Sequence, residues 1–168
     1  MVIRRAAPGD IKDLVAMHVL LRDYSGGCNR RVGRNQSERP EHLAKEYEGY
    51  LRSDSSAVFV AEQDGQLVGY VAGRVDRHPG WAPQVVGTVL AAFVRRECRR
   101  AGVATALIRE LLAFFESSGA EDITLRYVIG NRVGESFWRQ LGFEPVLCFA
   151  NTRPADLRAR LEQLGQQP

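Results

Sequence analysis

The chain has 168 residues, of which 45% are apolar and 26% charged, and its formal net charge is +3. These values predict one soluble globular domain over residues 1–168 and exclude a fibrous or disordered protein. Although only Lys12 and Lys45 of the 23 basic residues are lysines, a charge of +3 without a basic, aromatic-rich helix does not favour nucleic-acid binding.

No stretch has the apolar length of a signal peptide or a membrane span, which predicts a cytoplasmic protein that does not enter a membrane. The three cysteines lie far apart in the sequence, and the three histidines show no ligand spacing. We therefore expect neither a disulfide framework nor a bound metal.

The N-terminal quarter predicts a strand, Val2–Arg5, followed by a helix that begins after Asp10 as N-cap and runs from Ile11 to about Tyr24. His18 lies on the apolar face of that helix, where we expect a core or rim histidine rather than a catalytic base.

A polar segment, Ser25–Pro40, separates this helix from a second predicted helix, Glu41–Leu51. Loops of this length are often functional or disordered. The segment is either a solvated connection or a substrate-facing lid whose arginines would suit an acidic acceptor: Arg30, Arg31, Arg34 and Arg39.

Two β-rich runs, Ala57–Glu62 and Gln66–Gly73, flank Asp64-Gly65, a strong signal for a hairpin turn. The run Val85–Val94 is almost entirely apolar, which predicts a strand buried on both faces. An amphipathic helix, Val103–Phe115, follows it.

The last third predicts a strand (Asp122–Val128), a helix (Asn131–Leu141), a strand (Phe143–Ala150) and a short terminal helix at 153–164. The complete order is β-α-α-β-β-β-α-β-α-β with a terminal helix. It predicts a mixed α/β layer fold.

The stretch Arg99-Arg100-Ala101-Gly102-Val103-Ala104 joins the strand Val85–Val94 to the helix that follows. The first N–H groups of a helix have no intrahelical acceptor, and the helix dipole favours an anion there. Small residues beside two arginines therefore predict a phosphate-sized anion site.

Two landmarks resemble the GNAT superfamily of acyl-CoA-dependent N-acyltransferases. Arg99-x-x-Gly102-x-Ala104 resembles its (Gln/Arg)-x-x-Gly-x-(Gly/Ala) motif, and Asn131 followed by Phe137-Trp138-x-x-Leu141-Gly142-Phe143 resembles its second landmark. They lie in the family's order on the expected elements, and the element order agrees over nearly the whole chain. The resemblance implies a mostly antiparallel sheet in which two splayed parallel strands hold the donor.

The donor implied by the resemblance is acetyl-CoA or another acyl-CoA, with a small-molecule or protein amine as acceptor. The backbone N–H of Val94 would stabilise the oxyanion of the reaction. Asn131 would contact the donor, or it caps a helix. Arg95 and Arg96 are expected in solvent, and the donor-binding residues would be Phe93, Val94, Arg99, Arg100, Ala101, Gly102, Val103, Ala104, Thr105 and Asn131.

Two catalytic side chains that many family members carry are missing. Leu90 stands where a glutamate base is common, and Trp138 where a tyrosine acid is common; core packing is the favoured role for Trp138. The candidate replacements are Tyr127, Asp23, Tyr24 and Ser136.

Alternatives to an N-acetyltransferase are an acyl-CoA-binding sensor without turnover and a basic module that contacts nucleic acid. The sequence leaves open the acceptor, the acyl-chain preference, and whether the protein is a monomer or a homodimer.

Overall fold

The computed structural model describes residues 1–29, 31–32, 39–80 and 82–165. The chain forms two compact units, Met1–Gly130 and Asn131–Pro168. That residues 1–168 act as a single domain stays a prediction. None of the helices built from the described residues has the length and apolar content needed to cross a membrane.

The first unit contains a five-stranded sheet in which the strands lie in sequence order. All neighbours are antiparallel except β4 and β5, which are parallel. This is the mixed, mostly antiparallel sheet that the family resemblance implies. The strands are β1 (Val2–Arg5), β2 (Ser56–Gln63), β3 (Gln66–Arg77), β4 (Val85–Val94) and β5 (Asp122–Leu125).

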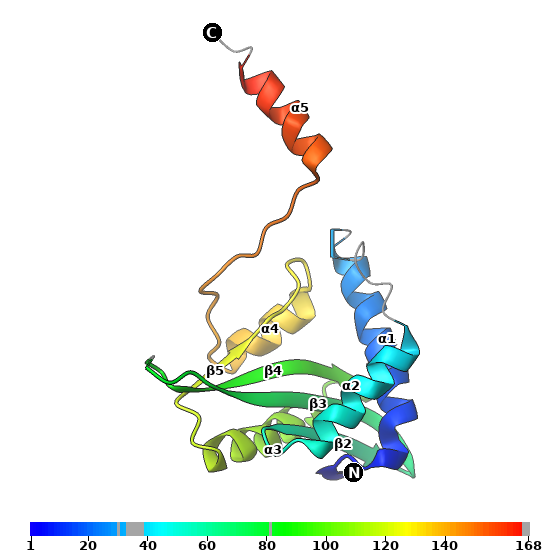
Figure 1. Ribbon diagram of the computed structural model, residues 1–168. Coiled ribbons are helices and arrows are strands. Elements are labelled where there is room, and N and C mark those ends of the chain that lie inside the picture. Colours follow the sequence, from blue (N-terminus) through cyan, green and yellow to red (C-terminus); the bar gives the residue numbers. More distant parts are fainter. Residues whose placement is uncertain (30, 33–38, 81, 166–168) are drawn as a thin grey trace. The chain divides into compact units, whose positions relative to one another are not determined.

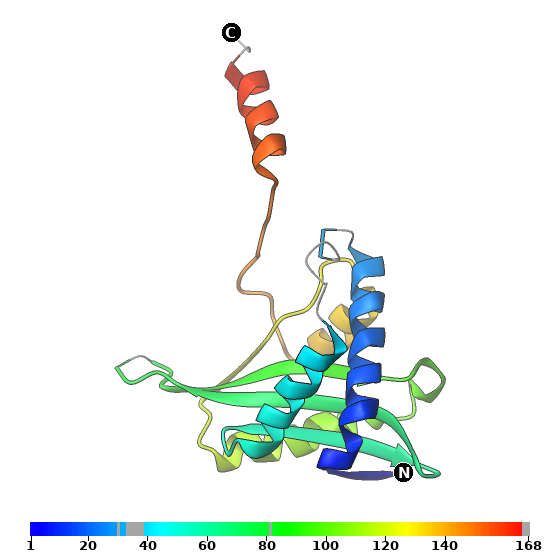
Figure 2. The ribbon, with the colours of Figure 1, turned by 45° about the vertical axis from the view of Figure 1, so that its right-hand side comes forward.

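Helices cover both faces of this sheet (Figure 1). Helices α1 (Ile11–Cys28) and α2 (Pro40–Arg52) lie on one face, and α3 (Val103–Ser117) lies on the other, as a second view also shows (Figure 2). The α1/α2 face holds an apolar cluster of buried residues, against which Leu90 is also packed. Its buried members are Leu14, Met17, Tyr47, Val58, Val60, Leu67, Tyr70, Ala72, Ala91 and Phe93.

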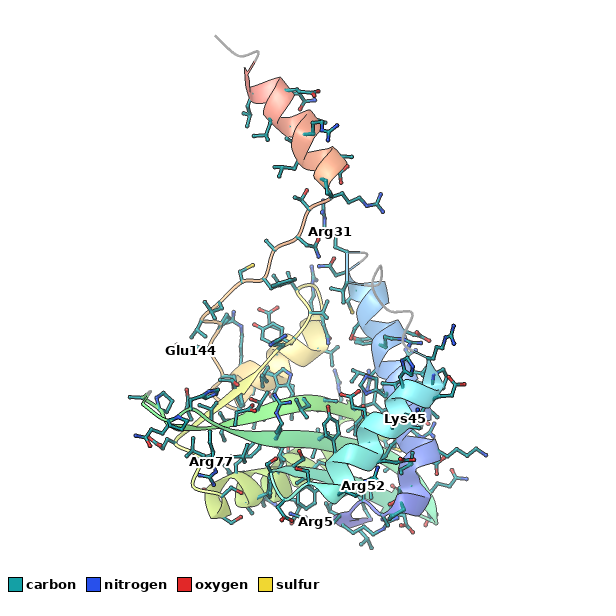
Figure 3. All side chains as sticks on the ribbon, viewed as in Figure 1. Arg5, Arg31, Lys45, Arg52, Arg77 and Glu144 are labelled. Atoms are coloured by element: carbon teal, nitrogen blue, oxygen red, sulfur yellow. The ribbon has the colours of Figure 1, made fainter. Side chains whose placement is uncertain are left out.

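Helix α3 approaches the sheet closely because glycines face it. A Cβ at Gly73 would lie 2.7 Å from the Leu111 side chain, and one at Gly87 would lie 2.8 Å from the Phe115 ring. Arg77 also donates a hydrogen bond of 3.1 Å to the Ser118 carbonyl just after α3 (Figure 3). These contacts fix the position of the helix whose N-terminus forms the candidate anion site.

The hairpin between β2 and β3 forms as predicted. Asp64 and Gly65 have φ angles of 52° and 76°. Two successive positive φ angles are typical of the type I′ turn that joins paired antiparallel strands. Strand β3 is longer than predicted and ends at Arg77, because it pairs with β4 as far as Val85.

Several local predictions in the first unit are wrong. Asp10 takes the predicted N-cap position of α1, but its side chain does not cap the helix: its carboxylate accepts hydrogen bonds from the Ala7 N–H and the Arg4 guanidinium instead. Helix α1 continues to Cys28, so the loop predicted over Ser25–Pro40 begins later than expected. Two arginines of that predicted loop, Arg30 and Arg34, lie outside the described residues. Strand β4 alternates buried and half-buried positions, because its two faces are covered to different extents.

Strand β5 ends at Leu125 rather than at Val128, because its pairing with β4 stops at that residue.

The second unit contains α4 (Arg132–Gln140) and α5 (Pro154–Gly165). Both helices were predicted, and α4 is followed by Gly142 with φ +88°, as expected for a left-handed helix end. The strand predicted over Phe143–Ala150 is wrong, since those residues have no regular secondary structure. Apolar β-formers make a strand only where a neighbour completes the hydrogen-bond ladder, and Pro145 has no N–H to donate.

The salt bridge between Arg4 and Asp10 near the N-terminus leads to a prediction about stability. Arg4 donates hydrogen bonds of 2.7 and 2.9 Å to Asp10 and holds the pKa of that carboxyl below its usual value of 3.8. The stabilisation is therefore present at neutral pH and is lost as the pH falls through the folded-state pKa. We expect Asp10→Asn to cost roughly 1–2 kcal/mol at pH 7, or about 2–8 °C in Tm.

The Tm difference between wild type and Asp10→Asn should begin to shrink as the pH falls below about 3.8, the usual carboxyl pKa, and should go on shrinking through the lower folded-state pKa as the carboxylate becomes protonated. Thermal unfolding followed by circular dichroism between pH 3 and 7 measures it. The matched control is Asp13→Asn, at an exposed position on α1, which should unfold like wild type at both ends of that range. A difference for Asp10→Asn that does not change with pH would contradict the assignment.

Candidate functional site

Strands β4 and β5 part before β4 ends. Their parallel pairing runs from Val86 opposite Asp122 to Val89 opposite Leu125, whereas β4 continues to Val94. Residues 90–94 therefore present one backbone edge that is paired with no strand of the described residues. This is the splayed arrangement that the family resemblance implies.

The N–H of Val94 points to that open edge. The Arg95 N–H donates to the Val68 carbonyl on β3 at 2.8 Å, and hydrogen bonding to one neighbour alternates along an antiparallel strand. The N–H and C=O of Val94 therefore face away from β3. The Val94 carbonyl indeed accepts a hydrogen bond of 3.1 Å from the Arg99 guanidinium, which lies outside the sheet.

The same alternation turns the N–H of Ala92 to the open edge and engages that of Phe93 with β3. Among the predicted residues on this strand, Val94 thus offers a backbone donor and Phe93 does not. Ala92 was missed from the sequence, although the two-residue period of a strand identifies it once the direction of Val94 is known.

The N-terminus of α3 lies a short turn after this edge. Gly102 precedes the helix with φ +76°, and nothing lies within 4 Å of the position that a Cβ would take. The first intrahelical bond runs from the Ala106 N–H to the Gly102 carbonyl at 3.0 Å. The N–H groups of Val103, Ala104 and Thr105 therefore have no acceptor within the helix, and the space beside Gly102 is open.

The arginines around this turn have different roles. Arg99 lies 5.4 Å from the centre of the Tyr24 ring, in addition to its bond to Val94, so it joins α1 to the end of β4. Arg100 is exposed, with φ +64°. Arg96 is exposed as expected, but Arg95 is not: it is half-buried and donates to the Leu67 carbonyl at 2.9 Å, because the strand end orders its side chain.

Asn131 caps α4. Its side-chain oxygen accepts a hydrogen bond of 2.9 Å from the Gly134 N–H, which confirms the capping interpretation. Trp138 packs edge-on against Phe137 and Phe143, with ring centres 5.0 and 5.5 Å away, as expected for a packing residue.

The side chains considered as replacements for the missing base and acid are otherwise engaged or lie near the surface. Asp23 pairs with Arg22 at 3.6 Å, and Tyr24 stacks on Arg99. Tyr127 is half-buried, and Ser136 is exposed on α4.

A polar cluster that the sequence did not reveal lies inside the α1/α2 core. His18 Nδ1 is 2.8 Å from the Tyr47 hydroxyl and 3.2 Å from the Tyr70 hydroxyl. Tyr47 is 1% exposed and Tyr70 0%, and burial raises the pKa of both phenols. The helical spacing of His18 indicates its face but cannot identify partners 29 and 52 residues away.

Comparisons with known proteins agree with this geometry. An N-alpha-acetyltransferase of Sulfurisphaera tokodaii is 34% identical over 116 residues, which are 63% of this chain and 62% of that protein. An uncharacterized N-acetyltransferase of Archaeoglobus fulgidus is 32% identical over 119 residues, 68% of this chain and 73% of that one. The matches span only 62%, 57% and 42% of the first three curated relatives.

Solved structures share the fold. A mutant of the BH1408 protein of Bacillus halodurans has a TM-score of 0.80 at 15% identity, covering 91% of this chain and 99% of that one. The aminoglycoside acetyltransferase AAC(6')-Iy, solved with a bisubstrate analogue, has a TM-score of 0.70 at 22% identity and coverages of 90% and 97%. The model of the acetyltransferase (GNAT) family matches residues 17–143. The chain therefore belongs to the GNAT acetyltransferase family.

The anion site at α3 can be tested by one substitution and its control. We expect Gly102→Glu to abolish the rise in Tm that saturating acetyl-CoA causes in wild type, because the carboxylate would stand where a phosphate binds. A ligand at 100 times its Kd adds about 2.7 kcal/mol of stability, or roughly 5–10 °C for a chain of this size. The measurement is thermal unfolding with and without acetyl-CoA.

Gly102→Ala is the matched control, because either residue must adopt the same positive φ, at a cost of about 1–2 kcal/mol. Both variants should therefore start from a similarly lowered Tm, but only Gly102→Ala should respond to acetyl-CoA. An equal response of Gly102→Glu would place the phosphates elsewhere.

Proposed function

We propose that this protein is an acetyl-CoA-dependent N-acetyltransferase that acts on a primary amine, either of a small molecule or of a protein. The observation that carries the proposal is the succession of two sets of backbone donors at one end of β4. The open edge at Ala92 and Val94 is followed within ten residues by the uncapped amides of α3.

The residues present fit such a donor. The pyrophosphate of acetyl-CoA carries the charge that the α3 N-terminus and Arg100 attract. Its pantetheine arm contains amides that can bind a strand edge, and residues 90–94 provide one. Family membership supports the same donor, and the solved structure of AAC(6')-Iy with CoA has a TM-score of 0.67 to this chain.

When bound, acetyl-CoA supplies a thioester carbonyl as the electrophile. The Val94 N–H, which points to the open edge, donates to the oxygen of that carbonyl as negative charge develops on it. The neighbouring strand edge and the α3 amides orient the donor, so that the amine attacks within one complex rather than in free solution.

A second candidate, a sensor that binds acyl-CoA without turnover, is favoured by one observation. Leu90 and Trp138, at the positions where many relatives have acid-base side chains, are both engaged in apolar packing. A screen separates the two functions: thiol release from acetyl-CoA, measured over a panel of peptides with free α-amines, lysine, polyamines and aminoglycosides. Acetyl-CoA binding without thiol release by any amine would establish the sensor and refute the enzyme.

The role of the Val94 N–H gives a further prediction. Proline at position 94 removes this N–H without breaking a bond to β3, because the group points away from that strand. We expect Val94→Pro to lower kcat by roughly 100- to 1,000-fold, the usual effect of losing one oxyanion donor. Steady-state thiol release with the best amine of the panel measures it.

Val94→Ala is the control, since it shortens the same side chain and keeps the N–H. It should retain kcat within a few-fold. If Val94→Pro keeps wild-type kcat, the Val94 N–H is not the oxyanion donor.

A further inference from the structure

His18 is placed by the buried face of α1 and held by two other elements. Tyr47 comes from α2 and Tyr70 from β3, and both hydroxyls meet the same ring nitrogen, Nδ1. The two phenol rings pack edge-on, with centres 5.9 Å apart. His18 itself is half-buried, so the ring lies at the rim of the core with its Nδ1 side turned inward.

The phenols can satisfy Nδ1 in either charge state of the imidazole. A tyrosine hydroxyl can accept a hydrogen bond from an Nδ1–H, which is present both in the neutral ring protonated at Nδ1 and in the doubly protonated ring. Nε2 is then the nitrogen that gains and loses the proton. The cluster can therefore hold one ring orientation while the histidine gains and loses a proton, without leaving a buried polar group unpaired.

The cluster lies over the end of β4 where the open edge is. Tyr70 is the register partner of Phe93, the residue before Val94. Tyr70 and Phe93 belong to the same buried group, against which Leu90 is packed, and α1 contacts both β3 and β4. The imidazole thus lies on the α1/α2 face of the strand segment whose edge presents the Val94 N–H.

Besides Tyr47 and Tyr70, the charged and titratable groups described around His18 come from α1 and α2. Helix α2 adds Glu46 and Tyr50, which hydrogen-bond to each other, and the charge of Glu46 acts on both buried phenols. On α1, Arg22 lies one turn further along and pairs with Asp23. The β4 residues in this group are apolar. The Glu46 carboxylate is thus an acidic group on α2 whose charge reaches the two phenols that hold His18.

We propose that His18 is the general base that takes the proton of the acceptor amine, held in place by Tyr47 and Tyr70. This inference rests on the proposed acetyl transfer. An alkylamine is mostly an ammonium ion at neutral pH, and only its free base has the lone pair that attacks a carbonyl. Of the three titratable side chains that meet in this cluster, His18 carries the imidazole, whereas burial raises the pKa of the Tyr47 and Tyr70 phenols and keeps them protonated.

The protons and bonds balance as follows. The ammonium gives one proton to Nε2 of neutral His18, because Nδ1 faces the phenols. The freed amine forms the C–N bond, the C–S bond breaks, and CoA leaves as a thiolate. The second proton of the attacking nitrogen passes to the thiolate, and His18 returns its own proton to solvent, leaving an amide, CoA thiol and one proton.

The decisive variant is His18→Asn, whose amide can still hydrogen-bond to the tyrosines. We expect kcat/KM at pH 7 to fall at least 100-fold for the alkylamine that wild type acetylates best, in the usual range for a lost general base. The KM for acetyl-CoA and the Tm rise with acetyl-CoA should not change. The ratio of wild-type to His18→Asn kcat/KM should fall about tenfold per pH unit above pH 7, because a growing share of the amine then loses its proton to solvent.

A change of acceptor tests the proton directly. An aminooxy analogue of the same acceptor is unprotonated at neutral pH, so His18→Asn should acetylate it within a few-fold of the wild-type rate. His42→Asn, at an exposed histidine on α2, is the control and should behave as wild type throughout. Tyr47→Phe and Tyr70→Phe test positioning, and each should lower kcat with the alkylamine more than with the aminooxy acceptor.

Equal losses with both acceptors, or a deficit that is constant with pH, would overturn the role of His18 as base and leave it a structural residue. Failure of the proposed function is distinguishable, because wild type would then release no thiol with any amine. That result would remove this inference as well.

Discussion

The departure of β5 from β4 is the constraint on which the candidate site depends. In a continuous sheet the outward N–H groups of β4 would be used by the neighbouring strand. Because the parallel pairing ends at Val89, the last five residues of β4 keep one row of donors available. Arg99 strengthens this arrangement by bonding to the Val94 carbonyl on the same edge, which fixes the direction of the Val94 N–H beside it.

The two faces of the sheet contribute different parts of the candidate site. On one face, close packing at Gly73 and Gly87 fixes α3, and with it the amides that suit a phosphate. On the other face, α1 and α2 bring His18, Tyr47 and Tyr70 together over the end of β4. An acyl-CoA on the open edge would accept hydrogen bonds from backbone N–H groups along its length. An amine that approaches from the α1/α2 face would contact the proposed base, His18.

Much of this architecture could be predicted from local sequence. The Asp64-Gly65 turn, the bounds of β4 and the start of α3 after Gly102 are encoded by neighbouring residues and were predicted correctly, and capping was one of the two roles expected of Asn131. Asp10 holds the predicted N-cap position, but its side chain bonds to Arg4 across a turn instead of capping the helix. The strand predicted over Phe143–Ala150 failed because strand formation depends on a distant edge, which a local pattern does not contain.

The chemistry was harder to predict for the same reason. The side chains of His18, Tyr47 and Tyr70 lie on three elements, and no spacing along the chain connects them. The direction of the Val94 N–H depends on the register between β3 and β4, which makes the Arg95 N–H donate to the Val68 carbonyl. A sequence pattern thus predicts where the phosphates would bind, whereas the proposed reacting end can be recognised only from the three-dimensional pairing.

The central claim is that an acyl-CoA lies along the open edge of β4 and on the first turn of α3. Residue-resolved amide hydrogen exchange, followed by NMR with and without saturating acetyl-CoA, tests it most directly. The account predicts strong new protection of the Ala92 and Val94 amides and of those of Val103 to Thr105, with little change at the β3-bonded Phe93 amide. Protection confined to other parts of the chain, or no change at Val94, would contradict it.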